Sequence, residues 1–154
     1  MNAYFMDTSA LVKRYIAETG SKWVEILTDP TADNQIIVVR LTQVEVVSAF
    51  YRLQREGKID SNDVAVVLKA FQHDWKTQYK VVEISTDLLE TAIALVQKYP
   101  LRAYDSVQLA AALTVNPAFA NFPTGSFTFI AADNRLLNAT QEEGLLIDDP
   151  NRHP

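Results

Sequence analysis

Cysteine is absent from this chain of 154 residues, which excludes disulfide bonds and thiolate metal sites. Histidine occurs only twice, as His73 inside a helical pattern and as His153 near the end, so a Ser–His–Asp hydrolase would lack its base. No uncharged apolar run approaches the roughly 18 residues of a membrane-spanning helix. Lys13 and Arg14 interrupt the apolar residues near the start, and no cleavage site follows, so a secretory signal is not expected. These absences predict a cytoplasmic protein that does not enter a membrane.

Positive charge is also in short supply. The chain has 14 Lys and Arg residues against 19 Asp and Glu residues, and its formal net charge is −5. Taken alone, this balance argues against a non-specific nucleic-acid binder. Bound divalent cations would offset part of the negative charge, however, and the charge close to a site matters more than the net charge.

The apolar residues fall into short runs separated by helical patterns. Four runs are β-branched or aromatic and mostly apolar throughout, which is typical of strands buried on both faces of a parallel sheet. These runs cover 3–6, 35–40, 80–85 and 127–132. The helical patterns, several of which end at Gly or before Pro, cover 8–19, 21–27, 42–56, 61–79, 86–99, 104–115 and 134–143. This alternation predicts a three-layer α/β/α sandwich with a central parallel sheet, formed by a single domain over residues 1–154.

Acidic residues stand where the predicted strands end. Asp7 directly follows the first strand, Asp133 follows the fourth, and Glu45 lies in the first turn of the helix after the second. The carboxyl ends of parallel strands share one edge, and the next helices begin there, so we expect these three acids to converge on one rim. Asp105 starts the apolar helix "YDSVQLAAAL" without a strand directly before it, which makes its place on the rim a weaker inference.

Each acid also has a purely structural interpretation. Asp7 could cap a helix, and Glu45 could be the last member of a capping box with Thr42. Asp105 could interact with a helix dipole, and Asp133 could belong to a turn. For Glu45 and Asp105 the structural interpretation is favoured when each residue is taken alone. All four interpretations would have to coincide at one rim, and this coincidence favours a site.

Carboxylates within a few ångströms of one another raise each other's pKa, and a divalent cation is the strongest compensation. A donor set made only of oxygens selects Mg²⁺ or Mn²⁺ rather than zinc. These ions keep coordination positions for water and for phosphate oxygens. The predicted rim therefore suits metal-assisted hydrolysis of a phosphodiester.

The order of these motifs resembles the PIN-domain ribonucleases, and within them the VapC toxins of toxin–antitoxin pairs. The motifs are "MDTSALVK", Glu45 early in a helix, "RAYDSVQLAAAL" and "FIAADNRLL", and the resemblance covers roughly residues 3–147. It implies a PIN-like fold, endoribonuclease activity with RNA as the substrate, and a cognate antitoxin as partner. It also implies a catalytic set that binds Mg²⁺ or Mn²⁺ and consists of Asp7, Glu45, Asp105 and Asp133. Ser9, or Thr8, would be a supporting polar group beside the metal.

Several basic residues lie close in sequence to the acids and could meet RNA phosphates. They are Lys13, Arg14, Arg40, Arg102 and Arg135. For Lys13 and Arg14 we favour ordinary solvated charge, whereas Arg102 and Arg135, together with Ser9, are candidate substrate-binding residues.

The helices at 42–53 and 61–75 carry more large apolar residues than one core-facing stripe requires. This excess predicts an exposed apolar surface for an antitoxin tail and for a second copy of the chain in a homodimer. The alternative is that both helices are buried in a larger core.

Three other interpretations share part of the pattern. A haloacid-dehalogenase-type phosphatase also has Asp-Thr at a strand end, but it needs a second Asp where this chain has Ser9. A receiver-type signalling module needs an acidic pair at the first strand tip, where only Asp7 stands. A non-catalytic binding module with a degenerate PIN fold stays open because Ala131 occupies a position where the family often has Ser or Thr.

Overall fold

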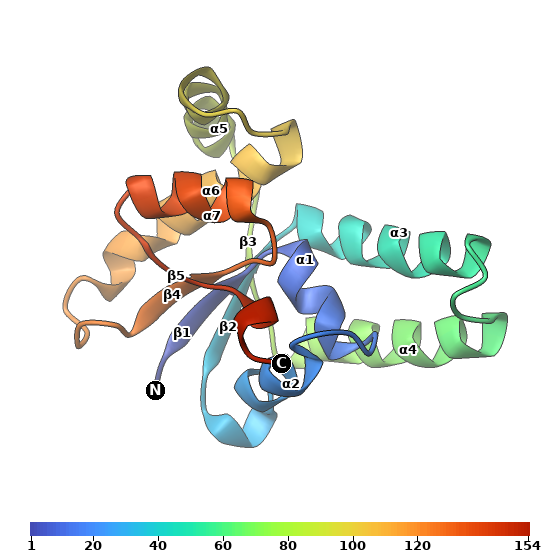
Figure 1. Ribbon diagram of the computed structural model, residues 1–154. Coiled ribbons are helices and arrows are strands. Elements are labelled where there is room, and N and C mark those ends of the chain that lie inside the picture. The colour runs from blue at the N-terminus through green and yellow to red at the C-terminus, as the bar shows by residue number, and fades with distance from the viewer.

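Five parallel strands form the centre of the structure, a computed structural model that describes residues 1–154 (Figure 1). The strands lie in the order β3-β2-β1-β4-β5, and every neighbouring pair is parallel. Their bounds are Ala3–Met6 (β1), Gln35–Val39 (β2), Lys80–Val82 (β3), Phe127–Ile130 (β4) and Leu146–Asp148 (β5). Beginning at β1, the chain first builds one half of the sheet and then crosses over to build the other. The strand order therefore reverses between β1 and β4.

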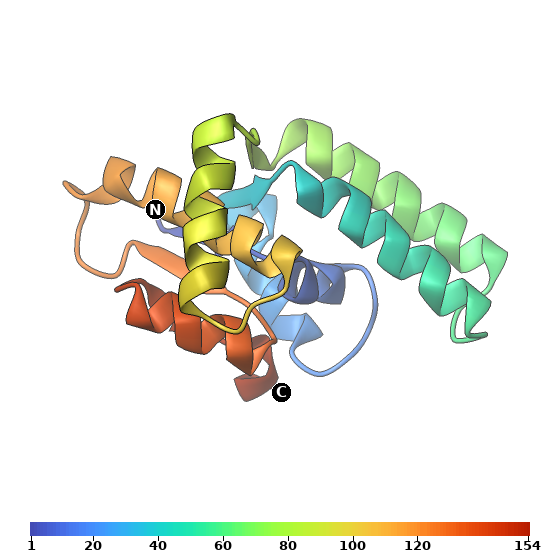
Figure 2. The same cartoon turned by 90° about the horizontal axis from the view of Figure 1, so that it is seen from above.

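Helices cover both faces of the sheet, so the predicted three-layer α/β/α architecture is confirmed (Figures 1 and 2). One face carries α1 (Thr8–Leu11), α2 (Ser21–Leu27), α3 (Leu41–Arg55) and α4 (Ser61–Thr77). The other face carries α5 (Thr86–Lys98), α6 (Ala103–Val115) and α7 (Asn134–Glu142). Short 3-10 turns occur at Val12–Arg14 (η1), Pro30–Ala32 (η2), Asn116–Phe119 (η3) and Pro150–Arg152 (η4). None of the helices combines the length and the apolar character needed to cross a membrane.

Two hydrophobic cores explain why the strands are apolar throughout. Alternate side chains of one strand point to opposite faces, and each face has its own layer of helices. Phe5 and Ile37 pack with α5, α6 and α7, whereas Met6, Ile36 and Val38 pack with α1, α3 and α4. Both faces of β1 and β2 are therefore buried, as the uninterrupted apolar runs predict.

The helices α3 and α4 lie side by side (Figure 2) and share an aromatic cluster. Phe50 of α3 meets Phe71 of α4 edge to face with ring centroids 6.1 Å apart, and Phe71 lies 5.6 Å from Trp75. Most of the large apolar side chains of these two helices therefore pack in the core. The large apolar residues left exposed on the pair are Val44, Tyr51 and Val66.

The edge strand β5 is absent from the sequence-based prediction. It has only three residues, and Leu146 is half exposed, so its side chains form no apolar run of the usual length. Its strand conformation depends on pairing with β4, where Ile130 lies opposite Asp148. A short edge strand of this kind is set by tertiary contacts rather than by its own pattern.

The prediction of one helix over residues 8–19 was wrong beyond the first turns. Helix α1 ends at Leu11, η1 adds three residues, and the chain then forms a loop. The Lys13 ammonium donates a 2.8 Å hydrogen bond to the Thr19 carbonyl and thereby holds the loop against the end of η1. A buried side chain thus fixes a segment that the periodicity alone assigns to a helix.

The C-terminal residues pack against α2. The His153 ring stacks on Trp23 with centroids 4.1 Å apart, and its Nε2 atom donates a 2.8 Å hydrogen bond to Asp148 Oδ1. Just before α2, Gly20 has φ +85°, and a Cβ there would lie 2.2 Å from the Pro150 carbonyl oxygen. Glycine is required at this position both by the backbone conformation and by the close approach of η4.

Candidate active site

The acids that follow β1 and β4 lie where the strand order reverses, the usual ligand position of open α/β sheets. A cavity of about 830 Å³ opens there, and its lining includes the four acids named from the sequence. We call it the acidic cavity, defined by Asp7, Glu45, Asp105 and Asp133. Asp105 reaches it from the first turn of α6, one of the helices that cover the sheet together with α5 and α7. No three of these side chains, and no other group of acidic or histidine residues, already has the geometry of a formed metal site.

Asp7 is buried and also caps α1. Its Oδ1 atom accepts hydrogen bonds from Ser9 Oγ at 2.7 Å and from the Ala10 backbone N–H at 3.1 Å. Its pKa is raised to about 7: burial is the largest cause, the charges of Asp105 and Glu45 add to it, and the two hydrogen bonds act in the opposite direction. The capping interpretation and the site interpretation therefore apply to the same residue.

Glu45 does not form the alternative capping box. Helix α3 begins at Leu41, its N-cap residue is Arg40, and no side chain caps it. Instead, Glu45 Oε1 accepts hydrogen bonds from Thr8 Oγ1 at 2.9 Å and from Gln108 Nε2 at 3.0 Å. Burial raises the pKa of Glu45, while these two donors lower it. The side chain is thus directed into the acidic cavity rather than back onto its own helix.

Asp105 and Asp133 complete the acidic cavity. Asp105 is buried in the first turn of α6, and no protein group donates a hydrogen bond to its carboxylate. Burial, followed by the charge of Asp133, raises its pKa to about 6. Asp133 caps α7, because its Oδ1 accepts from the Arg135 and Leu136 backbone N–H groups at 2.9 Å and 3.3 Å.

The four carboxylates suit a hard divalent cation. Protein donors bind only Oδ1 of Asp7, Oε1 of Glu45 and Oδ1 of Asp133, and they bind neither oxygen of Asp105. Each side chain therefore keeps at least one oxygen for a ligand. A donor set made only of oxygens suits Mg²⁺ or Mn²⁺, and the raised pKa values of Asp7, Glu45 and Asp105 show that negative charge is crowded and buried here. The assignment of these residues as metal ligands stays a prediction.

The three candidate substrate-binding residues differ in position. Arg102 lines the acidic cavity and donates a 2.6 Å hydrogen bond to the Tyr104 hydroxyl. Arg135 does not line it, although its charge lowers the pKa of Asp105. Ser9 also lines the cavity, but its hydroxyl is engaged: it donates to Asp7 and accepts from the Ala132 backbone N–H at 2.9 Å. Ser9 therefore joins Asp7 to the chain after β4 and acts as a support.

Solvated charge was the wrong interpretation for two basic residues. Lys13 is only 5% exposed, and its ammonium is bound by the Thr19 carbonyl and lies 3.6 Å from a Glu18 carboxylate oxygen. Arg14 is half buried on the far side of η1 and pairs with Asp74 at 3.1 Å. Arg40, at the start of α3, forms an ion pair with Glu83 on the surface.

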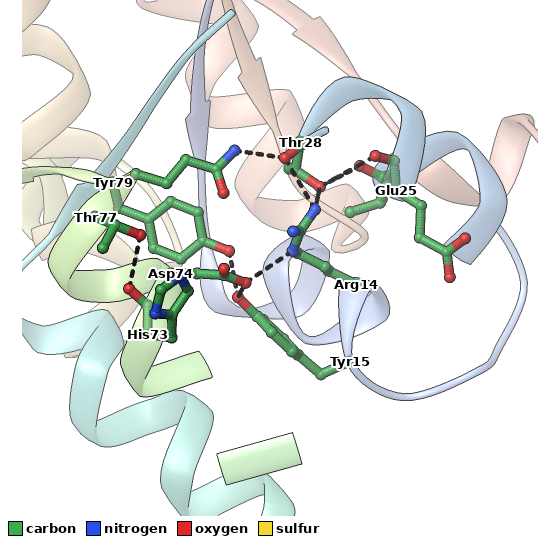
Figure 3. A network of polar contacts seen from close by, with 10 residues as sticks. Arg14, Tyr15, Glu25, Thr28, His73, Asp74, Thr77 and Tyr79 are labelled. Carbon is green, nitrogen blue, oxygen red and sulfur yellow. Dashed lines mark hydrogen bonds and ion pairs between the residues drawn. The ribbon is translucent and has the colours of Figure 1, made fainter. Parts of the chain in front are cut away.

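Arg14 belongs to a polar network that joins η1 to α2 and α4 (Figure 3). Its Nε donates to Asp74 Oδ2, and its Nη1 donates to the Thr28 carbonyl at 2.9 Å. The Tyr15 hydroxyl donates to the same Asp74 oxygen at 2.7 Å and is hydrogen-bonded to the Tyr79 hydroxyl. We call these residues the Arg14–Asp74 network; it holds in place the segment that begins with Asp7.

Several residues that line the acidic cavity were not predicted from the sequence. Gln108 lies one helical turn after Asp105, and Arg52 lies two turns after Glu45 on the same side of α3. Helical spacing from the two acids could have identified both. Tyr104 immediately precedes Asp105, and its ring is 39% exposed at the cavity.

No protein-family model and no curated protein matches the sequence. Solved structures do match over nearly its full length. A toxin–antitoxin complex from Klebsiella pneumoniae is 18% identical with a TM-score of 0.60, over 96% of this chain and 97% of that chain. FitAcB from Neisseria gonorrhoeae is 11% identical with a TM-score of 0.65, over 96% and 97%. VapC20 from Mycobacterium tuberculosis, a toxin that cleaves the sarcin–ricin loop, is 13% identical with a TM-score of 0.60, over 93% and 96%.

These likenesses establish the fold. The sheet of five parallel strands with helices on both faces is that of the PIN-domain toxins, and the resemblance suggested by the sequence motifs is confirmed at this level. Activity and partners of this chain are a separate question, because the identities are low.

Proposed function

We propose that this protein is a metal-dependent endoribonuclease and the toxin of a type II toxin–antitoxin pair. The observation that carries the proposal is the acidic cavity, in which four carboxylates each keep an oxygen free of protein hydrogen bonds. Such a set would hold Mg²⁺ or Mn²⁺ in an open site at the carboxyl edge of the sheet. The toxin–antitoxin complex and the sarcin–ricin-cleaving toxin among the structural neighbours support the same function by analogy.

Each part of the cavity has a defined task in RNA hydrolysis. The bound ion would activate water as the nucleophile and neutralise charge on the phosphate. Asp7, oriented by Ser9, and Glu45, oriented by Thr8 and Gln108, would hold the ion together with Asp105 and Asp133. Arg52 and Arg102, which line the same cavity, supply positive charge for the RNA backbone. This local charge answers the objection raised by the net charge of −5.

The test is incubation of the purified protein with total RNA in Mg²⁺, Mn²⁺ or EDTA, followed by analysis of the new RNA ends. We expect cleavage only with a divalent ion and products with a 5′-phosphate, because attack by water on phosphorus expels the 3′ oxygen. Cleavage that persists in EDTA, or products with a 2′,3′-cyclic phosphate, would contradict the proposal. Metal added back after EDTA treatment separates loss of the ion from loss of the protein.

The proposed antitoxin partner would act at the acidic cavity. A basic side chain from the partner could bind the carboxylates in place of the metal, since charge-assisted hydrogen bonds to carboxylates are strong. The Klebsiella neighbour is itself part of a toxin–antitoxin complex, which supports a partner of this kind. Expression with and without a candidate antitoxin tests it: we expect growth arrest from the chain alone and rescue by co-expression. Harmless expression of an active protein alone would count against the toxin role.

We also propose a homodimer, and the outer face of α5 offers a surface for it. Leu89, Ile93 and Val96 recur at helical spacing and are 43%, 57% and 40% exposed, beside the stripe that buries Leu88 and Leu95. An exposed apolar stripe of this kind is typical of interaction surfaces. Light scattering on the wild type and on Ile93→Lys is the test: the wild type should be a dimer and the variant a monomer, and a monomeric wild type would contradict it.

A further inference from the structure

The buried amide of Gln108 contacts the acidic cavity from α6. Gln108 is 1% exposed and lies one turn after Asp105. Its Nε2 atom is within hydrogen-bond distance of three oxygens: Thr42 Oγ1 at 2.9 Å, Glu45 Oε1 at 3.0 Å and Thr8 Oγ1 at 3.3 Å. Two of these three partners belong to α3, more than 60 residues earlier in the chain.

We infer that Gln108 is a positioning residue that sets the orientation of the Glu45 carboxylate for metal binding. The inference rests on the proposed function, since it concerns how the proposed ligand set is assembled. Thr8 and Gln108 both donate to Oε1 of Glu45, and this arrangement leaves Oε2 for a ligand. Thr8 follows Asp7, and Gln108 follows Asp105 by one turn. The two donors therefore fix Glu45 relative to the elements that carry two of the other three acids.

The oxygen of the Gln108 side-chain amide shows that packing alone does not explain why this residue is a glutamine. Gln108 Oε1 is buried and has no hydrogen-bond partner. A buried acceptor without a donor lowers stability, so an apolar side chain of similar size would suit the core better. Rotating the amide would not remove the problem, because the oxygen would then face the Glu45 carboxylate oxygen and repel it. The amide must therefore present its N–H groups to Glu45, and this hydrogen bond fixes the two side chains relative to each other.

Hydrogen bonds of this type orient metal ligands in other proteins, where loss of the outer partner typically weakens metal affinity about 10–100-fold. Gln108→Met keeps the approximate volume and removes the donor. A matched control is Thr140→Val in α7, which removes a buried side-chain hydrogen bond made only to its own helix, at the Leu136 carbonyl. Both variants lose one buried polar group, but only one of them touches Glu45.

The experiment is calorimetric titration of the full chain with Mn²⁺ in the absence of RNA, for wild type, Gln108→Met and Thr140→Val. We expect Gln108→Met to bind Mn²⁺ about 10–100-fold more weakly than wild type, and Thr140→Val to match wild type. RNA cleavage should show the same shift in the Mn²⁺ concentration for half activation, with an unchanged KM for RNA at saturating Mn²⁺.

A double-mutant cycle with Glu45→Gln provides the second readout. If Gln108 acts through Glu45, Gln108→Met should weaken Mn²⁺ binding no further in the Glu45→Gln background. Equal Mn²⁺ affinity in wild type and Gln108→Met, or additive losses in the cycle, would overturn the inference while leaving the proposed function intact. A Gln108→Met chain that does not fold would overturn it as well, since the amide would then serve the fold. A wild type that binds no Mn²⁺ would overturn both.

Discussion

The acidic cavity and the Arg14–Asp74 network lie on opposite sides of the segment that runs from Asp7 through η1, and they differ in how their charges are compensated. In the network, the Arg14 guanidinium meets the Asp74 carboxylate and the Thr28 carbonyl (Figure 3). In the cavity, four carboxylates face one another, and Asp105 receives no hydrogen bond from the protein.

This difference separates a structural cluster from a candidate site. Buried polar groups are normally paired, because an unpaired buried charge is costly. The Arg14–Asp74 network obeys this rule and needs no ligand. In the acidic cavity no acid forms an ion pair with a basic side chain, and the pKa values of Asp7, Glu45 and Asp105 are raised. A cluster of groups that the protein itself leaves uncompensated is the better candidate for binding something from outside.

The largest effect is expected from neutralising one acid in the cavity. Asp7→Asn should lower RNA cleavage by several orders of magnitude, because it removes a charged ligand. The fold should be retained, since the asparagine oxygen can still accept from Ser9 and the Ala10 backbone. Cleavage rates at saturating Mn²⁺, beside circular dichroism spectra, provide the measurement. A folded and fully active Asp7→Asn protein would exclude Asp7 from the catalytic set.

The second effect concerns Glu45 and the response of stability to metal. Mn²⁺ at about 100 times its Kd should stabilise the wild type by about 2.7 kcal/mol, because only the folded chain binds it. Glu45→Gln should gain less. Without metal, Glu45→Gln should be at least as stable as wild type near neutral pH, because the change reduces repulsion among the acids. Thermal melts with and without Mn²⁺ measure both differences, and an identical metal response in the two proteins would remove Glu45 from the ligand set.

The third prediction concerns the Arg14–Asp74 network. Asp74→Ala leaves the half-buried Arg14 and the Tyr15 hydroxyl without their shared acceptor, and we expect a loss of about 1–3 kcal/mol in the free energy of unfolding. The increase in stability on adding Mn²⁺ should equal that of wild type. Urea unfolding in both conditions is the measurement, and a changed metal response would show that the network is coupled to the cavity.

The last prediction concerns the pH dependence of the metal-free protein. In the folded chain the pKa of Asp7 is about 7 and that of Asp105 is about 6, against an ordinary value of 3.8. A raised pKa contributes stability that is fully present below the unfolded-state pKa and is lost as pH rises through the folded-state pKa.

The free energy of unfolding in EDTA should therefore increase as pH is lowered from about 8 to about 5, a window that lies above the pH at which other carboxylates titrate. The increase should be smaller in Asp7→Asn, which lacks one of the titrating groups. Urea titrations across this window give the result. A stability that is flat, or that falls toward pH 5, would contradict the crowding of these acids.

Much of the fold follows from local pattern, and the exceptions have physical causes. β1, β2 and β4 are buried on both faces, so each appears as a continuous apolar run. β5 has three residues and takes its conformation from its neighbour β4. The end of α1 depends on a lysine that bonds a carbonyl in the following loop.

In the candidate site, too, some features follow from local pattern and others depend on tertiary contacts. The acids could be placed because each stands at the end of a strand or the start of a helix, and parallel topology brings such positions together. The role of Gln108 could not, because its contact with Glu45 joins residues 63 apart in sequence. The burial of Arg14 likewise depends on Asp74, 60 residues later. Hydrogen-bond partners at such separations are set by packing, and no local pattern encodes them.

Metal binding by the acidic cavity is tested most directly by calorimetric titration of wild type and Asp105→Asn with Mn²⁺, without RNA. Asp105 is the most informative position because its carboxylate has no protein hydrogen bond that asparagine would disturb. We predict saturable binding to the wild type and binding to Asp105→Asn that is at least about 10-fold weaker, with unchanged stability in EDTA or a small gain. Absence of saturable binding to the wild type, or equal affinity in the two proteins, would contradict the claim that the acidic cavity is a metal site.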